Sequence, residues 1–165
     1  MKLCIGKKIM TDAPQKNILA QGVIEAVCSS PEKHTGKQQV DEAELRIAHG
    51  LVGDAHGGSR REVSLLALED IKNGQGHLVL QPGDFAENLT TSGIQLEKLP
   101  VGSKLHVGSQ VILEVTQIGK KCHTKCEIFE KLGDCVMPKK GIFARVVQGG
   151  VVSKGCPILC LEDEG

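Results

Sequence analysis

The chain contains almost no aromatic residues. Its 165 residues include three Phe and neither Trp nor Tyr, so it offers few surfaces on which nucleic-acid bases could stack. It also lacks an excess of charge, because 20 acidic residues balance 20 basic residues and the formal net charge is zero. Without a field of one sign, nothing draws the whole chain to nucleic acid or to an anionic membrane. These absences disfavour a nucleic-acid-binding function.

Long apolar runs are missing as well. No stretch approaches the roughly 20 apolar residues that a membrane-spanning helix requires. The first ten residues, MKLCIGKKIM, lack the apolar run of a secretory signal peptide. We therefore expect a cytoplasmic protein whose seven cysteines are reduced. Reduced thiols favour ligand or nucleophile roles over disulfides.

Glycine, in contrast, is abundant, with 20 residues, which indicates many tight turns around a core of aliphatic side chains. A length of 165 residues suits one domain that covers the whole chain, 1–165. Residues 1–17 are basic and apolar without a clear period, and we expect an N-terminal arm or an edge strand there.

Short β-branched or alternating segments between turn residues predict a mainly β fold. The predicted strands are 18–30, 40–46, 62–66, 104–107, 111–118, 142–147, 151–152 and 157–161. A short helix is predicted over 67–76, closed by Asn73-Gly74, and turns at Gly108-Ser109 and Gly149-Gly150 predict hairpins. Seven or more short strands with one to three short helices predict a closed or nearly closed β-barrel.

The stretch 120–144 concentrates the reactive side chains. It holds Cys122, His123, Cys126 and Cys135. Lysines and the histidine beside Cys122 would lower the pKa of its thiol, and a thiolate is the form that attacks sulfur or binds metal. A second thiol at Cys126, four positions later on the same face of a helix, could resolve a persulfide or share a metal.

Other readings of these cysteines remain open. The three thiols and His123 could bind zinc, although their spacing lacks the paired knuckles of a zinc ribbon. Cys122 alone could be a ligand of molybdenum, because thiolate is a soft ligand. Cys126 and Cys135 could also pack in the core. Packing is the role assigned to the other cysteines, which are Cys4, Cys28, Cys156 and Cys160.

A glycine-rich loop within 49–71 forms a second candidate region. Its backbone amides could approach a ligand closely, while Asp54, His56, Arg60 and Arg61 supply charge. The plainer reading is a long turn whose polar residues satisfy the backbone. The spacing matches neither a phosphate-binding Walker loop nor the G-x-G-x-x-G of dinucleotide-binding proteins, so nucleotide binding is not supported.

A polar run over 87–91 allows two interpretations. It is either a surface strand whose side chains bond across it, or a segment whose Asn88 and Thr90 face the same pocket as the loop around Gly53.

Taken in order, several motifs resemble the MOSC domain family, a module found at the C-terminus of molybdenum-cofactor sulfurases and as free-standing bacterial proteins. They are GDAHGG at 53–58 with Arg61 and VSLL at 63–66, PGDFAENLT at 82–90, LPVG at 99–102, and the cysteine stretch. The resemblance implies a MOSC-type β-barrel that binds the molybdenum cofactor or a pterin-like ligand, or that carries sulfur as a cysteine persulfide.

The resemblance places the family's cysteine at Cys122, which here follows Lys121 where many members have proline. It implies a sulfur donor in trans, such as a cysteine desulfurase, because the chain is too short to contain a pyridoxal-phosphate domain. The recipient would be a molybdoenzyme or a cofactor biosynthesis protein. Whether the chain transfers sulfur as an enzyme or carrier, or serves as a non-catalytic accessory module or a zinc-stabilised module, stays open.

The predicted site therefore has two halves. Sulfur chemistry falls to Cys122, also the candidate molybdenum ligand, with Cys126 and His123. A pterin phosphate could use Arg61 or Arg145 with glycine amides, although such cations are more often a solvated rim. The full cofactor-binding set is Gly53, Asp54, His56, Gly57, Arg61, Asn88, Thr90 and Arg145.

Overall fold

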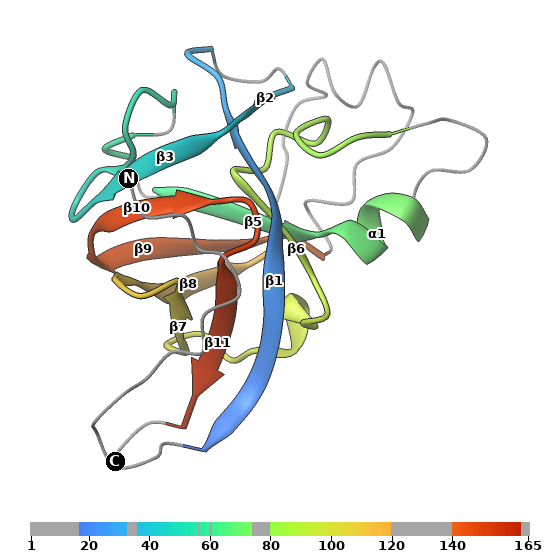
Figure 1. The fold of residues 1–165 in the computed structure, drawn as a ribbon, viewed down its shortest axis with the longest axis vertical. Coiled ribbons are helices and arrows are strands. Elements are labelled where there is room, and N and C mark those ends of the chain that lie inside the picture. The colour runs from blue at the N-terminus through green and yellow to red at the C-terminus, as the bar shows by residue number, and fades with distance from the viewer. Residues whose placement is uncertain are drawn as a thin grey trace.

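A computed structural model shows the fold (Figure 1). The residues that it describes are 17–32, 36–55, 57–59, 61–73, 80–119 and 140–162. The predicted N-terminal arm lies outside them except for its last residue, and the cysteine stretch lies outside them up to position 139.

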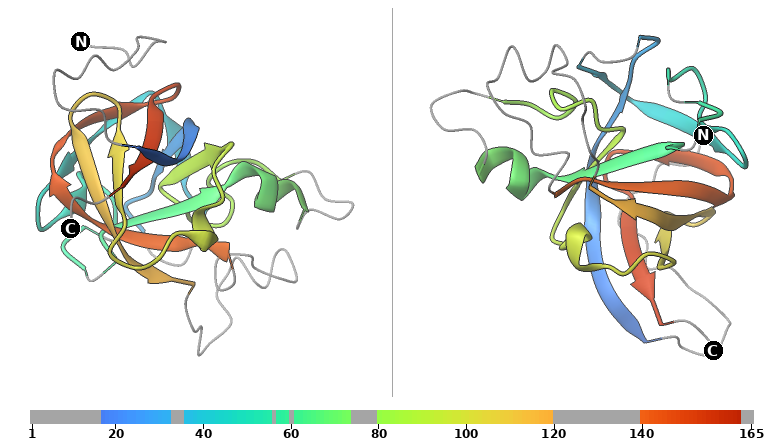
Figure 2. Two further views of the ribbon diagram at one scale, coloured as in Figure 1. Left: turned by 90° about the horizontal axis from the view of Figure 1, so that it is seen from below. Right: turned by 180° about the vertical axis from the view of Figure 1, so that it is seen from behind.

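Strands close into a barrel, which Figure 2 shows end-on in its left view. Around the ring they are β1 (Ile18–Ser29), β6 (Leu89–Ser92), β5 (Val63–Ala67), β9 (Ile142–Gln148), β8 (Val111–Ile118), β7 (Lys104–Val107) and β11 (Pro157–Leu161). Neighbours are antiparallel except β5 and β6, which are parallel. The predicted mainly β, barrel-type fold is confirmed.

The long strand β1 makes closure possible. Within the ring its 12 residues reach two partners: Val23 pairs with Pro157 of β11 and also with Ser92 of β6. The register with β6 shifts between Ile24 and Ala26, and such an irregularity lets a strand bend away from a flat sheet. In Figure 1, β11 runs beside the lower half of β1.

A three-stranded sheet lies against the barrel. It consists of β10 (Gly150–Ser153), β3 (Glu42–Arg46) and β4 (Gly50–Leu51), in the order β10-β3-β4. The single strand predicted over 40–46 is therefore two strands. The short β2 (Gln38–Val40) pairs with β1, whereas β3 pairs with β10. The chain changes sheets at Asp41, a change that the apolar pattern does not encode.

The two hairpin predictions have different outcomes. Gly108 has a φ of 64° and joins the antiparallel strands β7 and β8, so that hairpin is confirmed. The hairpin at Gly149-Gly150 is wrong, because β10 pairs with β3 and not with β9. A Cβ on Gly149 would lie 2.5 Å from the carbonyl oxygen of Leu45. This glycine permits close approach to β3 and does not provide positive φ.

The barrel interior is apolar and almost entirely aliphatic. Its largest fully buried members include Ile24, Leu65, Leu89, Leu105, Leu113 and Ile142. No helix among the described residues is long and apolar enough to cross a membrane.

A second, smaller core lies outside the barrel wall. It comprises Leu66, Ile71, Phe85 and Phe143. The short helix α1 (Leu68–Asn73) contributes Ile71 to this core, and it confirms the helix predicted within 67–76. A 3₁₀ turn, η1 (Leu96–Lys98), follows β6. All five residues of β5 are buried, because the strand faces the barrel interior on one side and this second core on the other. Ser64, the polar residue on its outer face, is consequently buried as well.

Candidate functional site

The cysteine stretch leaves the barrel after β8 and returns to it at β9. The amide of Gly119 donates to the carbonyl oxygen of Gly141 across 2.7 Å, which fixes the base of the stretch. The predicted sulfur residues Cys122, His123 and Cys126 lie outside the described residues, as does Cys135. Their roles stay predictions.

Arg61 lies beside this base. Its guanidinium carbon is 5.3 Å from the ring centroid of Phe143, two residues beyond Gly141, a distance typical of a cation–π contact. Arg61 is half-buried, and its guanidinium forms no ion pair or hydrogen bond with the described residues. Among the described residues, therefore, no carboxylate neutralises this cation.

Next along β5, Ser64 is bound to Asn88. The amide and the hydroxyl of Ser64 both donate to Oδ1 of Asn88, across 3.0 and 3.1 Å, and the amide of Asn88 donates to the carbonyl oxygen of Ser64 across 2.9 Å. Nδ2 of Asn88 donates to the carbonyl oxygen of Cys28 across 3.2 Å, so the Asn88 side chain ties β5 to the end of β1.

A fully enclosed carboxyl group lies just before Asn88. Oε1 of Glu87 accepts from the amide of Gly83 across 3.0 Å, and Oε2 accepts from the hydroxyl of Thr90 across 2.9 Å. Burial raises the pKa of Glu87 to about 7, against the opposing effect of these hydrogen bonds. Burial, and then the charge of Glu87, raise the pKa of the neighbouring Cys28 thiol to about 12. Cys28 is thus an inert, buried thiol, as predicted.

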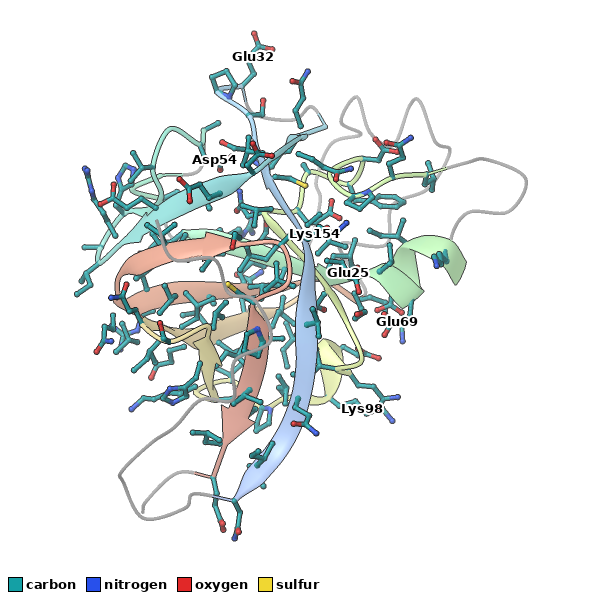
Figure 3. The ribbon with its side chains drawn as sticks, viewed as in Figure 1. Glu25, Glu32, Asp54, Glu69, Lys98 and Lys154 are labelled. Atoms are coloured by element: carbon teal, nitrogen blue, oxygen red, sulfur yellow. The ribbon has the colours of Figure 1, made fainter. Side chains whose placement is uncertain are left out.

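The loop around Gly53 is fastened by a buried ion pair. Nζ of Lys37 lies 2.6 Å from Oδ1 of Asp54, and their side chains are 1% and 0% exposed. The same oxygen accepts from the amide of Ser30 across 3.1 Å, and the amide of Ala55 donates to the carbonyl oxygen of Ser30 across 2.8 Å. Asp54 therefore holds the glycine-rich loop against the end of β1 (Figure 3).

These contacts join into one buried polar network. Its side chains come from Lys37, Asp54, Ser64, Glu87, Asn88 and Thr90. Because Cys28 bonds to Asn88 and Ser30 bonds to Asp54, the structure brings the Gly53 loop and the 82–90 motif to the same end of β1. Sequence motifs about 30 positions apart thus lie side by side. We call the surface that the Gly53 loop and the 82–90 motif form together the wall of the candidate site.

The network decides the interpretation of the polar run at 87–91. Asn88, Thr90 and Thr91 are 0% exposed, so a surface strand is wrong. The polar atoms of Asn88 and Thr90 bind other parts of the protein, which makes both residues braces of the wall. The hydroxyl of Thr91 is buried without a hydrogen-bond partner among the described residues.

The glycines of the candidate loop differ in their roles. Gly53 adopts a φ of +88°, and a Cβ there would meet no atom within 4 Å. Its backbone faces open space. Gly57 lies against the imidazole of His49, where a Cβ would be 2.7 Å from Nε2. His56 and Arg60 lie outside the described residues.

Arg145 is not part of the network. Its guanidinium donates to a carboxylate oxygen of Glu114 on the neighbouring strand β8, on the exposed outer surface of the barrel. That hydrogen bond raises the pKa of Arg145. Of the two arginines predicted to bind phosphate, Arg61 is the one whose charge is not matched by a described carboxylate.

Sequence reasoning missed Lys37, and no local signal could have revealed it. It stands in a polar turn, yet the fold buries its ammonium group against Asp54. Glu87 belongs to a recognised motif, but its complete enclosure follows only from the packing of the 81–88 loop on β1 and β5.

The remaining cysteines complete the inventory. Cys28 and Cys160 are buried. Cys156 is buried and disulfide-bonded, so the prediction that all thiols are reduced is wrong for this residue. A disulfide depends on which cysteines the fold brings within reach, and an odd count does not reveal that. No group of three His, Cys, Asp or Glu side chains that could hold a metal ion occurs among the described residues.

Solved structures with a similar fold include three bacterial proteins. YuaD from Bacillus subtilis superposes with a TM-score of 0.71 over 86% of this chain and 97% of its own, at 18% sequence identity. YiiM from Escherichia coli gives 0.62 over 87% and 70%, at 22% identity. YiiM from Geobacillus stearothermophilus gives 0.64 over 86% and 75%, at 17% identity. At these identities the likeness concerns the fold.

No curated protein matches the chain. The family model of the MOSC domain, however, matches residues 52–159. This range covers more than half of the 165 residues and includes the glycine-rich loop, the 82–90 motif and the cysteine stretch. The chain belongs to the MOSC domain family.

Proposed function

We propose that the chain binds a molybdenum cofactor, or a related sulfur-containing ligand, at the outer face of β5 and β9, with Cys122 as sulfur carrier or metal ligand. The observation that carries this proposal is Arg61, a cation fixed over Phe143 beside the base of the cysteine stretch. A cation next to a reactive thiol suits a ligand that carries both phosphate and sulfur. Membership of the MOSC family supports the same ligand class.

The described residues fit the phosphate end of such a ligand. Arg61 would supply charge-assisted hydrogen bonds, and the open turn at Gly53 would supply backbone approach. Asp54, Asn88 and Thr90 would hold the wall in place without touching the ligand, because their side chains already bind protein groups. The bound cofactor would supply metal–sulfur chemistry, while this chain binds and orients it.

In the sulfur-carrier role, Cys122 receives sulfur from a donor in trans. The Cys122 thiolate attacks the outer sulfur of the donor's persulfide, a new S–S bond forms on Cys122, and the donor cysteine leaves as a thiolate. A cysteine desulfurase is a suitable donor, and a molybdoenzyme or a cofactor biosynthesis protein a suitable recipient. These partners, and the cytoplasm as the place where they meet, belong to the proposal.

The test uses the full chain with a cysteine desulfurase and free cysteine. Mass spectrometry should find an added sulfur atom on Cys122, and none on Cys28 or Cys160, whose burial makes them internal controls. Cys122→Ser should abolish loading. If this variant changes neither persulfide loading nor binding of purified molybdopterin, the proposal fails. Binding without loading identifies an accessory module in place of a sulfur carrier.

Arg61 is tested separately. Arg61→Gln should weaken molybdopterin binding roughly tenfold or more, since a hydrogen bond to a charged group is worth about 1.5–3 kcal/mol. Arg46→Gln is the matched control, because Arg46 is an exposed arginine paired with Glu44 on the separate three-stranded sheet. Equal binding by both variants contradicts a phosphate site at Arg61.

A further inference from the structure

Glu87 is a carboxyl group with no contact to solvent. It is 0% exposed, and both of its oxygens accept hydrogen bonds from neutral donors, the Gly83 amide and the Thr90 hydroxyl. The backbone of Phe85 and of Glu87 itself adds further hydrogen bonds that lower its pKa, yet burial outweighs them all. Among the described residues it has no ion-pair partner. An ionised carboxylate in such a place pays a desolvation cost that neutral donors offset only in part.

The described charged and titratable groups near Glu87 do little to offset that cost. From β1 comes the Cys28 thiol, which burial keeps neutral. From the segment before β2 comes Lys37, whose ammonium group binds Asp54 at 2.6 Å. From the same loop comes Asp84, a further acid. β5 contributes the neutral Ser64, which is occupied by Asn88.

We propose that Glu87 is a proton-controlled latch that sets how firmly the 81–88 loop holds the wall of the candidate site. With the proton bound, the enclosed carboxyl is neutral and the loop stays closed. When the proton leaves to solvent, the buried negative charge favours opening, in which the carboxylate reaches water. The latch regulates the wall of the proposed ligand site, yet it operates whether or not a ligand binds.

Opening of the 81–88 loop would affect the rest of the wall, because the loop is in close contact with the segment that carries Lys37 and with Cys28. The amide of Lys37 donates to the carbonyl oxygen of Gly83 across 2.7 Å. A Cβ on Gly83 would lie 2.1 Å from that lysine's carbonyl oxygen and 3.3 Å from Sγ of Cys28. Loosening of the loop therefore releases the segment that carries Lys37, and with it the ion pair to Asp54.

The direction of the pH effect follows from proton linkage. Burial raises the pKa of Glu87 from 4.5 to about 7 in the closed state, whereas the opened group regains its ordinary value. Between these pH values the closed state holds a proton that the open state has lost. Stability of the closed loop consequently falls as pH rises through this window, and the loss is complete above about pH 7.

The test is amide hydrogen exchange on the unliganded wild-type chain at about pH 5.5 and pH 8, with each rate divided by its intrinsic rate. The open population reported by the amides of Gly83 and Lys37 should rise roughly tenfold or more at the higher pH. The amide of Val115 in β8, which donates to the carbonyl oxygen of Ser103 just before β7, is the reference and should change much less.

Two variants and one direct measurement decide the matter. Glu87→Gln should remove the pH dependence at Gly83 and Lys37, while Asp84→Asn, the matched control on the same loop, should keep it. Carbon-13 titration of the Glu87 carboxyl in the wild type requires no variant to fold. A midpoint near 4.5, or an unchanged pH dependence in Glu87→Gln, overturns the latch. Neither result bears on ligand binding, so it leaves the proposed function intact.

Discussion

The barrel interior and the polar network outside its wall are equally buried and chemically opposite. Inside, aliphatic side chains such as Leu65, Leu105 and Leu113 are 0% exposed. Outside, Asp54 and Glu87 are 7% and 0% exposed, and each is held by directional hydrogen bonds. The interior is filled by apolar side chains that need no hydrogen bonds. The network is filled by polar side chains, each of which needs specific hydrogen-bond partners.

The two regions contribute differently: the apolar interior mainly stabilises the fold, and the polar network mainly fixes where the loops lie. Apolar burial contributes about 25 cal/mol per Å² and tolerates exchange among similar side chains. Burial of charges and amides is close to neutral overall, but it is unfavourable for any arrangement that leaves a partner unmatched. The interior therefore keeps the barrel folded, whereas the network determines where the Gly53 loop and the 81–88 loop lie.

The largest effect that tests this contrast is expected at the buried ion pair of Lys37 and Asp54. Asp54→Ala removes the carboxylate 2.6 Å from the buried ammonium of Lys37. We expect a loss of about 3–5 kcal/mol in the free energy of unfolding, because a buried charge then lacks its counter-charge. Urea denaturation followed by circular dichroism measures it.

A double variant separates the charge from the space it fills. Lys37→Met combined with Asp54→Leu should recover most of the lost stability, since apolar replacement of a buried pair is often neutral or better. A double variant as unstable as Asp54→Ala would mean that the pair stabilises the fold by its own attraction, against the division drawn above.

The interior is tested at Leu113, on the strand β8. Leu113→Ala should cost about 3 kcal/mol through lost burial and the cavity left behind, measured by the same urea titration. Amide exchange around the 81–88 loop should change only as global unfolding changes. Selective loosening of that loop in Leu113→Ala would show that the barrel interior also positions the wall.

The smallest effect is expected at an exposed ion pair. The side chains of Arg46 and Glu44 are 60% and 47% exposed, and the pair spans 3.1 Å. Glu44→Gln should change the free energy of unfolding by less than about 0.5 kcal/mol, because solvent screens such pairs. Thermal unfolding at low and high salt gives the value. A loss above about 1 kcal/mol would remove the contrast between buried and exposed pairs on which the comparison rests.

Much of the architecture was predictable from local patterns. The alternation of VILEVTQI gave β8, and the turn at Gly108 gave its hairpin with β7. The Gly149-Gly150 pair misled, because a glycine needed for close approach to Leu45 resembles one needed for a tight turn. Local sequence does not distinguish these two uses of glycine.

The candidate site was predictable only in part. The motifs named Asp54, Arg61, Asn88 and Thr90, but not which of them brace the wall and which remain available. The side chains of Asn88 and Thr90 bind protein groups, while Arg61 lies over Phe143 without a partner carboxylate among the described residues. Whether a polar side chain is already bound depends on partners from distant segments. Lys37, the partner of Asp54, had no local signal in the sequence.

By itself, the sequence determined the family, the barrel-forming strands and the cluster of thiols, because motifs and alternation of side chains are local properties. Only the tertiary structure decided that a lysine from a polar turn meets Asp54, that Glu87 is sealed from water, and that Arg61 stands beside the base of the cysteine stretch. These are contacts between segments far apart in the chain. Their energies depend on burial, which no single segment carries alone.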